Sequence, residues 1–299
     1  MESLFLPSPD LMQASLRNSL AEFADVEWLS QINSTNVFLV QSAKDTTQES
    51  FRPALIGAHY QTSGKGRLGR KWAGESGGTL MFSCAYDVFL EDAKLPMLAP
   101  VAGIVACEEL RKTVGDAFAP RLSMKWPNDI QYNDAKLSGL LVETVKPSLG
   151  RRGEQHRVVV VGMGMNLAHA RELSQSLGRK VADWTSVLQD MHKDVQQMNQ
   201  SMALLVARIA RAWYEAFAVY EREGFAPFVS RHQVMDALYD KVVDVWQDDK
   251  FVMRGIAKGL DDKAHLILEL SNGQLLPLLT GDITVRALES DDMGVCSEQ

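Results

Sequence analysis

The chain has 299 residues, 46% hydrophobic and 23% charged, and its 31 basic and 38 acidic residues give a formal net charge of -7. This composition indicates a globular protein with one large domain or two medium ones, since domains average roughly 150 residues. The negative charge excludes a uniformly basic nucleic-acid-binding surface, so any local cluster of cations is informative.

Cysteine usage and hydropathy indicate a reducing compartment and no membrane segment. Cys84, Cys107 and Cys296 are widely spaced and form no C-x-x-C pair, which argues against a disulfide framework or a zinc site. The start of the chain lacks a signal-peptide pattern, and no apolar run approaches the ~18 residues of a membrane span. We therefore expect a cytoplasmic protein.

The first part of the chain reads as alternating helices and strands. Apolar residues at helical spacing predict a short helix over 11–24, and a polar N-cap pattern at 33–36 predicts the start of another. Longer helices are predicted over 98–114 and 202–223, each ending at a glycine. Strands are predicted over residues 26–32, 54–61, 79–87, 122–126, 137–145 and 157–162.

After Pro227 the pattern changes to short strands separated by turns. Asn272-Gly273 between apolar runs is a strong hairpin signal, and the spacing predicts a small barrel of roughly 50 to 60 residues. Its strands are predicted over 241–247, 251–258, 265–270, 275–279 and 283–287, with a turn at Asp248-Asp249. The predicted organisation is a helical extension (1–25), a main domain (26–235), the barrel (236–290) and a solvated tail (291–299).

The densest cationic cluster is a glycine-rich loop at residues 64–72. It contains Lys65, Arg67, Arg70 and Lys71 and ends at Trp72, a composition suited to an anion because glycines let backbone N–H groups approach and arginine offers a planar fork. A solvated surface loop is the alternative. The dinucleotide pattern G-x-G-x-x-G matches here, but a strand and not a helix follows, so we reject it. The nucleophile-elbow pattern at 74–78 fails likewise, and Ser76 is predicted to be a turn residue.

Three further segments place polar side chains beside strands. Lys-Trp-Pro-Asn-Asp at 125–129 precedes Lys136 and Gly139, so two lysines, an amide and a carboxylate could converge, with Asn128 and Asp129 on a loop. An ordinary turn and an exposed strand end are the alternatives. The strand at 158–162 runs into glycines and Asn166, which permits close approach of a ligand or only close packing.

The sequence shows no metal-binding pattern. The histidines have no ligand spacing and there is no Walker A loop, so a metal would come with a nucleotide.

Taken together and in this order, Ser34-Thr35-Asn36, Gln61 with the 64–72 loop, the 125–129 and 136–139 segments, and 162–166 resemble the biotin protein ligases. The resemblance covers residues 26–287. It implies an α+β fold, with a mixed β-sheet flanked by helices and a small C-terminal SH3-like β-barrel. Some relatives carry an N-terminal DNA-binding domain, but the predicted extension is shorter than the roughly 55 to 65 residues such a domain needs. We therefore expect a monofunctional ligase without a nucleic-acid partner.

The resemblance also implies a reaction and its residues. ATP and biotin would form biotinyl-5′-AMP, from which a lysine of a biotin carboxyl carrier protein takes the biotin. Arg67 and Lys136 would neutralise phosphate and carboxylate charge, and Asp129 would organise the amine or Mg²⁺ brought by ATP. Biotin would contact Ser34, Thr35, Gln61, Gly64, Arg67 and Gly139. The nucleotide would contact Arg67, Arg70, Lys136, Asn166 at the adenine edge, Trp184 by stacking or else in the core, and Arg286 from the barrel.

Two departures and two alternatives stay open. Lys65 and Leu68 stand where the family often has arginines, which removes one guanidinium fork and one charge. A lipoate or octanoate protein ligase or transferase of related fold is the nearest alternative, and a non-catalytic biotin- or nucleotide-binding module is another. A cysteine nucleophile is not expected, because Cys84 and Cys107 lie in apolar periodic segments. No membrane partner is expected, and a homodimer is left open.

Overall fold

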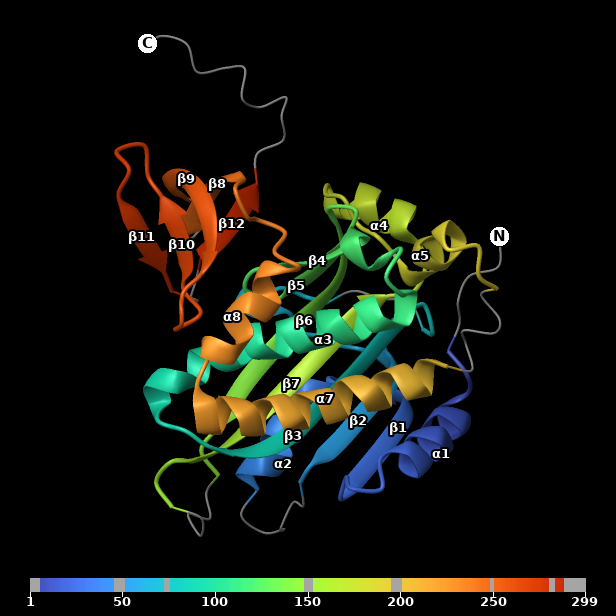
Figure 1. The fold of residues 1–299 in the computed structure, drawn as a ribbon. Coiled ribbons are helices and arrows are strands. Elements are labelled where there is room, and N and C mark those ends of the chain that lie inside the picture. The colour runs from blue at the N-terminus through green and yellow to red at the C-terminus, as the bar shows by residue number, and fades with distance from the viewer. Residues whose placement is uncertain are drawn as a thin grey trace.

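A computed structural model describes residues 6–45, 52–72, 76–147, 153–194, 201–247, 250–279 and 283–287. Its centre is a seven-stranded sheet in the order β1-β2-β3-β7-β6-β5-β4 (Figure 1). β1 and β2 are parallel and every other pair is antiparallel, so the predicted mixed sheet is confirmed. The strands are β1 (Asp25–Ile32), β2 (Ala54–Gln61), β3 (Thr79–Phe89), β4 (Leu122–Lys125), β5 (Asp129–Tyr132), β6 (Ala135–Val145) and β7 (His156–Asn166).

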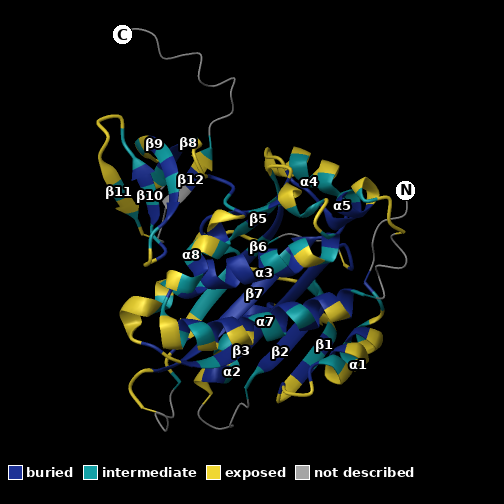
Figure 2. Ribbon diagram, in the orientation of Figure 1, coloured by how far each residue is buried: buried dark blue, intermediate teal, exposed yellow. Residues whose placement is uncertain are grey.

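Helices cover both faces of this sheet. α3 (Leu98–Val114) and α7 (Met202–Glu223) pack on one face, and α2 (Thr35–Lys44) packs on the other. β3 serves both faces because its side chains alternate: Phe82 stacks on Trp213 of α7, whereas Ala85 packs with the α2 cluster. Figure 2 shows the buried residues concentrated in the strands and on the inner sides of these helices.

The first helix, α1 (Pro9–Ser19), belongs to this core. It begins two residues before the predicted range because Ser8 caps it and Pro9 occupies the first turn. Gln13 accepts the N–H of Trp28 at 3.0 Å, and Arg17 donates to the carbonyl oxygen of Val26 at 3.0 Å. The helix thereby satisfies two backbone groups on the open edge of β1, which would otherwise be a site for unwanted strand pairing.

Several short elements were not predicted. They are α4 (Ala170–Leu177), α5 (Trp184–Asp190), α8 (Ala226–Gln233), β5, and the 3-10 turns η1 (Arg67–Gly69), η2 (Asp92–Met97) and η3 (Ala119–Arg121). Asp129, predicted to lie on a loop with Asn128, is the first residue of β5, so only Asn128 is in the turn. Elements of three to eight residues hold too few apolar positions for a helical or strand period to stand out.

The C-terminal part forms a second sheet, antiparallel and in the order β11-β10-β9-β8-β12, which agrees with the small β domain predicted. Its strands are β8 (Val242–Gln247), β9 (Lys250–Leu260), β10 (Leu266–Glu269), β11 (Leu275–Leu278) and β12 (Ile283–Ala287). Gly273, at positive φ, lies in the predicted turn between β10 and β11. The predicted turn at Asp248-Asp249, the tail at 291–299 and Cys296 lie outside the described residues.

Two contacts join this domain to the large sheet. The buried Trp126, in the β4–β5 turn, donates its indole N–H to the carbonyl oxygen of Ala264 at 3.0 Å. The backbone N–H of Ala237 donates to the carbonyl oxygen of Met124 at 3.0 Å. The 125–129 segment therefore forms part of the junction between the two domains.

Candidate active site

A cavity of about 650 Å³ lies among the loop after β2, the β4–β5 hairpin, β6, β7 and β12. Its described lining holds eight cationic residues and one carboxylate, Asp129, in a protein whose formal net charge is -7. The cations are Lys65, Arg67, Arg70, Lys71, Lys125, Lys136, Arg179 and Arg286. Such a local excess of positive charge favours a polyanionic ligand.

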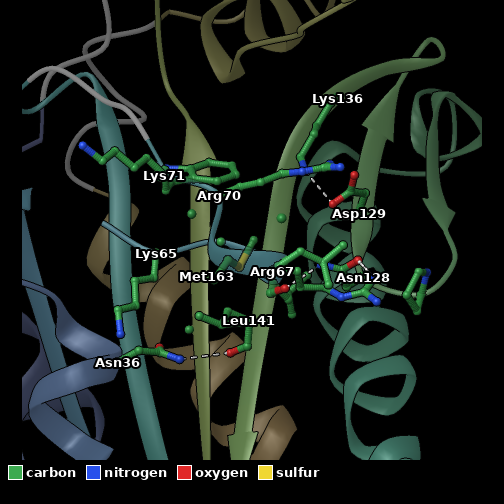
Figure 3. A pocket seen from close by; sticks show the side chains of 18 of the residues that line it. Asn36, Lys65, Arg67, Arg70, Lys71, Asn128, Asp129, Lys136, Leu141 and Met163 are labelled. Atoms are coloured by element: carbon green, nitrogen blue, oxygen red, sulfur yellow. Dashed lines mark hydrogen bonds and ion pairs between the residues drawn. The ribbon is translucent and has the colours of Figure 1, made fainter. Parts of the chain in front are cut away.

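The glycine-rich loop folds back on itself over this cavity. Trp72 donates its backbone N–H to Gly64 at 2.9 Å, and Gly66 donates to Arg70 at 2.7 Å. Between these two hydrogen bonds, Leu68 (φ 55°) and Gly69 (φ 69°) adopt the left-handed backbone conformation and so reverse the chain. Figure 3 shows the side chains of Lys65, Arg67, Arg70 and Lys71 around the cavity. The predicted anion-binding loop is thus a compact turn that carries four cations.

Arg67 connects this loop to the 125–129 segment. Its Nη1 donates to Asn128 Oδ1 at 3.0 Å, and Asn128 Nδ2 donates to the carbonyl oxygen of Leu140 at 2.7 Å. The Asn128 carbonyl oxygen accepts the backbone N–H of Leu140 at 2.9 Å. The amide therefore fixes Arg67 relative to β6, and two motifs 61 residues apart meet at one wall of the cavity.

Lys136 and Asp129 form an ion pair at 2.6 Å on adjacent strands. Lys136 Nζ lies 5.6 Å from the centre of the Trp72 ring, within the range of a cation–π contact. Lys125 pairs across the β4–β5 hairpin with Asp129, and burial lowers its pKa, with nearby cations adding to that effect and Asp129 opposing it. Arg286 of β12 lies over the Trp246 ring at 4.8 Å. Cations from both domains therefore converge at this end of the cavity.

Neutral polar groups form the floor of the cavity, near the start of α2. Ser34 caps α2, and its side chain accepts the N–H of Val37. The backbone N–H of Thr35 donates to Gln61 Oε1 at 2.8 Å. Asn36 and Ser83 complete this floor of neutral side chains, and Lys65 is drawn beside Asn36 in Figure 3. Figure 3 shows Asn36 at the opposite end of the drawn cavity from Lys136 and Asp129.

Two strand glycines make room for side chains of the site. A Cβ on Gly164 would lie 2.3 Å from the Trp72 ring, and one on Gly162 would lie 2.0 Å from Asn36 Oδ1. Real Cβ atoms do not approach so closely, so only glycine fits at either position. The sequence allowed either a ligand or close packing at these glycines, and the structure supports packing of Trp72 and Asn36 against them.

Nine of the twelve predicted site residues line the cavity: Ser34, Thr35, Gln61, Arg67, Arg70, Asp129, Lys136, Gly139 and Arg286. Gly64, Asn166 and Trp184 do not. Gly64 packs under Trp72, the Asn166 amide donates to the carbonyl oxygen of Ala182 at 3.1 Å, and Trp184 is fully buried in the core. The biotin contact of Gly64 and the adenine contact of Asn166 stay predictions, and the burial of Trp184 favours the core position that the sequence left open.

Some lining residues carried no functional prediction. Ser83 lies within an alternating apolar strand, and Arg179 follows the unpredicted helix α4. A lone buried hydroxyl in such a strand, beside an N-cap rich in polar residues, is the signal that could have identified Ser83. The position of Arg179 depends on how α4 packs, so nothing in its own segment indicated it.

No cluster of three or more His, Cys, Asp or Glu side chains suited to a metal ion occurs among the described residues. Asp129 is the one carboxylate on the described cavity lining, and a single carboxylate fits Mg²⁺ only if phosphate oxygens supply other ligands. The helices of the described ranges include none that is both long and apolar enough to cross a membrane.

Comparisons with known proteins agree with this geometry. The Biotin/lipoate A/B protein ligase family matches residues 28–166. The bifunctional ligase/repressor BirA of Salmonella typhimurium is 30% identical over 285 residues, covering 95% of this chain and 82% of that protein. The biotin--[acetyl-CoA-carboxylase] ligase of Mycobacterium tuberculosis is 24% identical, covering 92% and 96%.

Solved structures show the same fold. The biotin protein ligase of Aquifex aeolicus, in complex with biotin and ATP, superposes with a TM-score of 0.67 at 22% identity, covering 89% of this chain and all of that chain. With the sequence match to BirA, the mixed sheet and the cationic cavity identify the class. This chain belongs to the biotin/lipoate A/B protein ligase family.

Proposed function

We propose that this protein is an ATP-dependent biotin protein ligase, which attaches biotin to a lysine of a biotin carboxyl carrier protein through biotinyl-5′-AMP. The observation that carries the proposal is the cavity, which joins a neutral polar floor to a wall of eight cations. A ligand with a polar, uncharged head and a carboxylate tail fits this arrangement beside a nucleotide. The relative from Mycobacterium tuberculosis, which is named a biotin--[acetyl-CoA-carboxylase] ligase and matches along 92% of this chain, supports the same substrate and acceptor.

The cations address the main difficulty of the first step. The biotin carboxylate attacks the α-phosphorus of ATP, an acyl phosphate bond forms, and pyrophosphate leaves. Both reactants are anions, so Lys136 and Arg67 lower the barrier by neutralising charge as they meet. Holding the reactants aligned supplies roughly 7 to 11 kcal/mol more. No covalent nucleophile is required from the protein.

The second step uses the same wall of the cavity. The acceptor amine attacks the acyl carbon of the adenylate, the acyl–oxygen bond breaks, and AMP leaves with its charge. Asp129 is the carboxylate we assign to organise that amine or Mg²⁺ bound to ATP, since it is the one acidic group on the described lining. When bound, Mg²⁺ would neutralise phosphate charge, with Asp129 as its protein ligand.

The alternatives fit less well. Cys84 and Cys107 are buried, and burial raises the pKa of each to about 12, so neither supplies a thiolate for a cysteine-based acyl transfer. A dithiolane such as lipoate has no hydrogen-bond donors to match the polar floor. A module that only bound biotin would not need eight cations on the lining of its cavity.

Pyrophosphate exchange into ATP tests the proposal. We expect exchange that depends on biotin and none above background with lipoate, because only biotin offers a urea to the floor and a carboxylate to the cations. Transfer of radiolabelled biotin to a carrier domain then tests the second step. Exchange with lipoate and not with biotin would refute the assignment.

The packing of Trp72 on Gly164 gives a further prediction. Gly164→Ala would place a methyl group 2.3 Å from the indole and displace the loop that carries Arg67. We expect the KM for ATP to rise at least about tenfold, since overpacking of a rigid contact typically costs 1–3 kcal/mol. Trp72→Leu added to Gly164→Ala should recover part of the loss by making room. If Gly164→Ala alone had wild-type KM values, the role assigned to the contact between Trp72 and Gly164 would be contradicted.

The remaining parts of the proposal concern setting and partners. We propose a cytoplasmic location, in keeping with the two described cysteines, which form no disulfide. Two further points stay predictions: that the protein acts without nucleic acid, and that it can form a homodimer. Analytical sedimentation with and without biotin and ATP measures the oligomeric state.

A further inference from the structure

The floor of the cavity contains a continuous chain of hydrogen bonds that ends outside the ligand space. We call Asn36, Ser83 and Thr35 the floor relay. Asn36 and Ser83 are both buried, and their side chains bond to each other. The relay matters because a hydroxyl can be either a donor or an acceptor, and its neighbours decide which.

The orientation of the Asn36 amide is fixed at its nitrogen. Nδ2 donates to Glu143 Oε2 at 2.9 Å and to the carbonyl oxygen of Leu141 at 3.3 Å. Neither of these oxygens can donate, so both amide protons are committed. Figure 3 shows the contact with Leu141. The amide oxygen Oδ1 must therefore face Ser83.

The relay then fixes two hydroxyl protons. Ser83 Oγ lies 2.6 Å from Asn36 Oδ1, which can only accept, so the single hydroxyl proton of Ser83 is used there. Thr35 Oγ1 lies 2.7 Å from Ser83 Oγ, and either atom could donate by distance alone. Because the Ser83 proton is already committed, Thr35 must be the donor. Its single proton goes to Ser83, the nearer acceptor, rather than to Gln61 Oε1 at 3.2 Å, and its lone pairs remain for the cavity.

We propose that the floor relay sets Thr35 Oγ1 as an obligate acceptor, and that Asn36 and Ser83 are positioning residues that select a ligand head with N–H donors. The inference rests on the proposed function, because the cyclic urea of biotin is such a head, whereas a dithiolane or an alkyl chain is not. The carboxylate of biotin lies at the far end from its urea. A urea on the floor therefore directs the carboxylate towards Lys136, which Figure 3 shows at the opposite end of the cavity from Asn36.

Asn36→Leu tests the relay, since leucine has nearly the shape of asparagine but accepts nothing. The Ser83 proton then becomes free to point at Thr35, and Thr35 becomes free to donate into the cavity. We expect the KM for biotin in pyrophosphate exchange to rise about tenfold or more, with the KM for ATP within about twofold of wild type. Ser83→Ala, a smaller change, should shift the KM for biotin in the same direction.

A second readout separates this role from a structural one. Biotin methylated on each urea nitrogen in turn loses one N–H, and at the nitrogen that faces Thr35 this should weaken wild-type binding about tenfold. In Asn36→Leu the same methylation should cost at most about twofold, because the acceptor is no longer fixed. Equal methylation penalties in both proteins would overturn the inference, whatever the change in KM.

Ser138→Ala is the matched control. Ser138 is a fully buried hydroxyl on β6 that donates to the carbonyl oxygen of Gly164 at 2.8 Å and does not line the cavity. Its removal should leave the KM for biotin and the methylation penalties unchanged. If wild-type protein neither binds biotin nor exchanges with it, the proposed function fails. If wild type binds biotin but Asn36→Leu and Ser83→Ala bind it equally well, only the relay fails.

Discussion

Lys136→Ala is expected to lower the rate of biotin-dependent pyrophosphate exchange by about 10²- to 10³-fold, the usual effect of removing one preorganised group that stabilises developing charge. Lys136 lies on the cavity wall, paired with Asp129 at 2.6 Å and held beside the Trp72 ring. Its removal also takes away the ion-pair partner of Asp129. The Asp129 carboxylate then repels the phosphates of ATP, which Lys136 would have attracted.

The step that is lost distinguishes this role from a general loss of stability. Exchange reports adenylation alone, and transfer from added biotinyl-5′-AMP reports the second step. We expect the rate of transfer from added biotinyl-5′-AMP to fall much less than the rate of pyrophosphate exchange. Lys94→Ala removes an exposed lysine that does not line the cavity and serves as the control. Wild-type exchange in Lys136→Ala, or equal losses in both steps, would show that Lys136 is not the group that promotes adenylation.

The parts of the fold that sequence predicted best are those with a long apolar period. The predicted bounds of β2 (54–61) and α3 (98–114) coincide with the observed elements, because each carries enough buried positions for its period to be clear. The loop at 64–72 and the segment at 125–129 were predicted to belong to one ligand-binding site. Arg67 and Asn128 now join them directly.

The errors share a physical cause. The strand observed as β7 was predicted to end at Gly162, yet it continues to Asn166, and Gly162 and Gly164 accommodate side chains from α2 and the loop. For Trp184 the sequence left adenine stacking and the core open, because its own segment does not decide between them. Its complete burial follows from the packing of α5 against distant residues, which no local pattern contains.

Arg67→Gly is expected to release biotinyl-5′-AMP about 10- to 100-fold faster than wild type, because a charged hydrogen bond to the ligand is typically worth 1.5–3 kcal/mol. Arg67 is held against Asn128 at 3.0 Å at the edge of the glycine-rich loop, so it lies where the loop would close over the adenylate. Glycine removes both the guanidinium and the contact that fixes the loop to β6.

Release of the adenylate has a consequence that slow chemistry does not. A free acyl phosphate reacts with any nearby amine, so the variant should biotinylate added bystander proteins while it still forms adenylate. Rapid-quench measurement of adenylate in the filtrate, with labelling of a bystander protein, reads out both effects. Arg67→Lys keeps the charge but loses the fork, and we expect it to lie between wild type and Arg67→Gly. Retention of the adenylate by Arg67→Gly at the wild-type rate would mean that other cations of the wall hold it, and Arg67 would then act in loop closure alone.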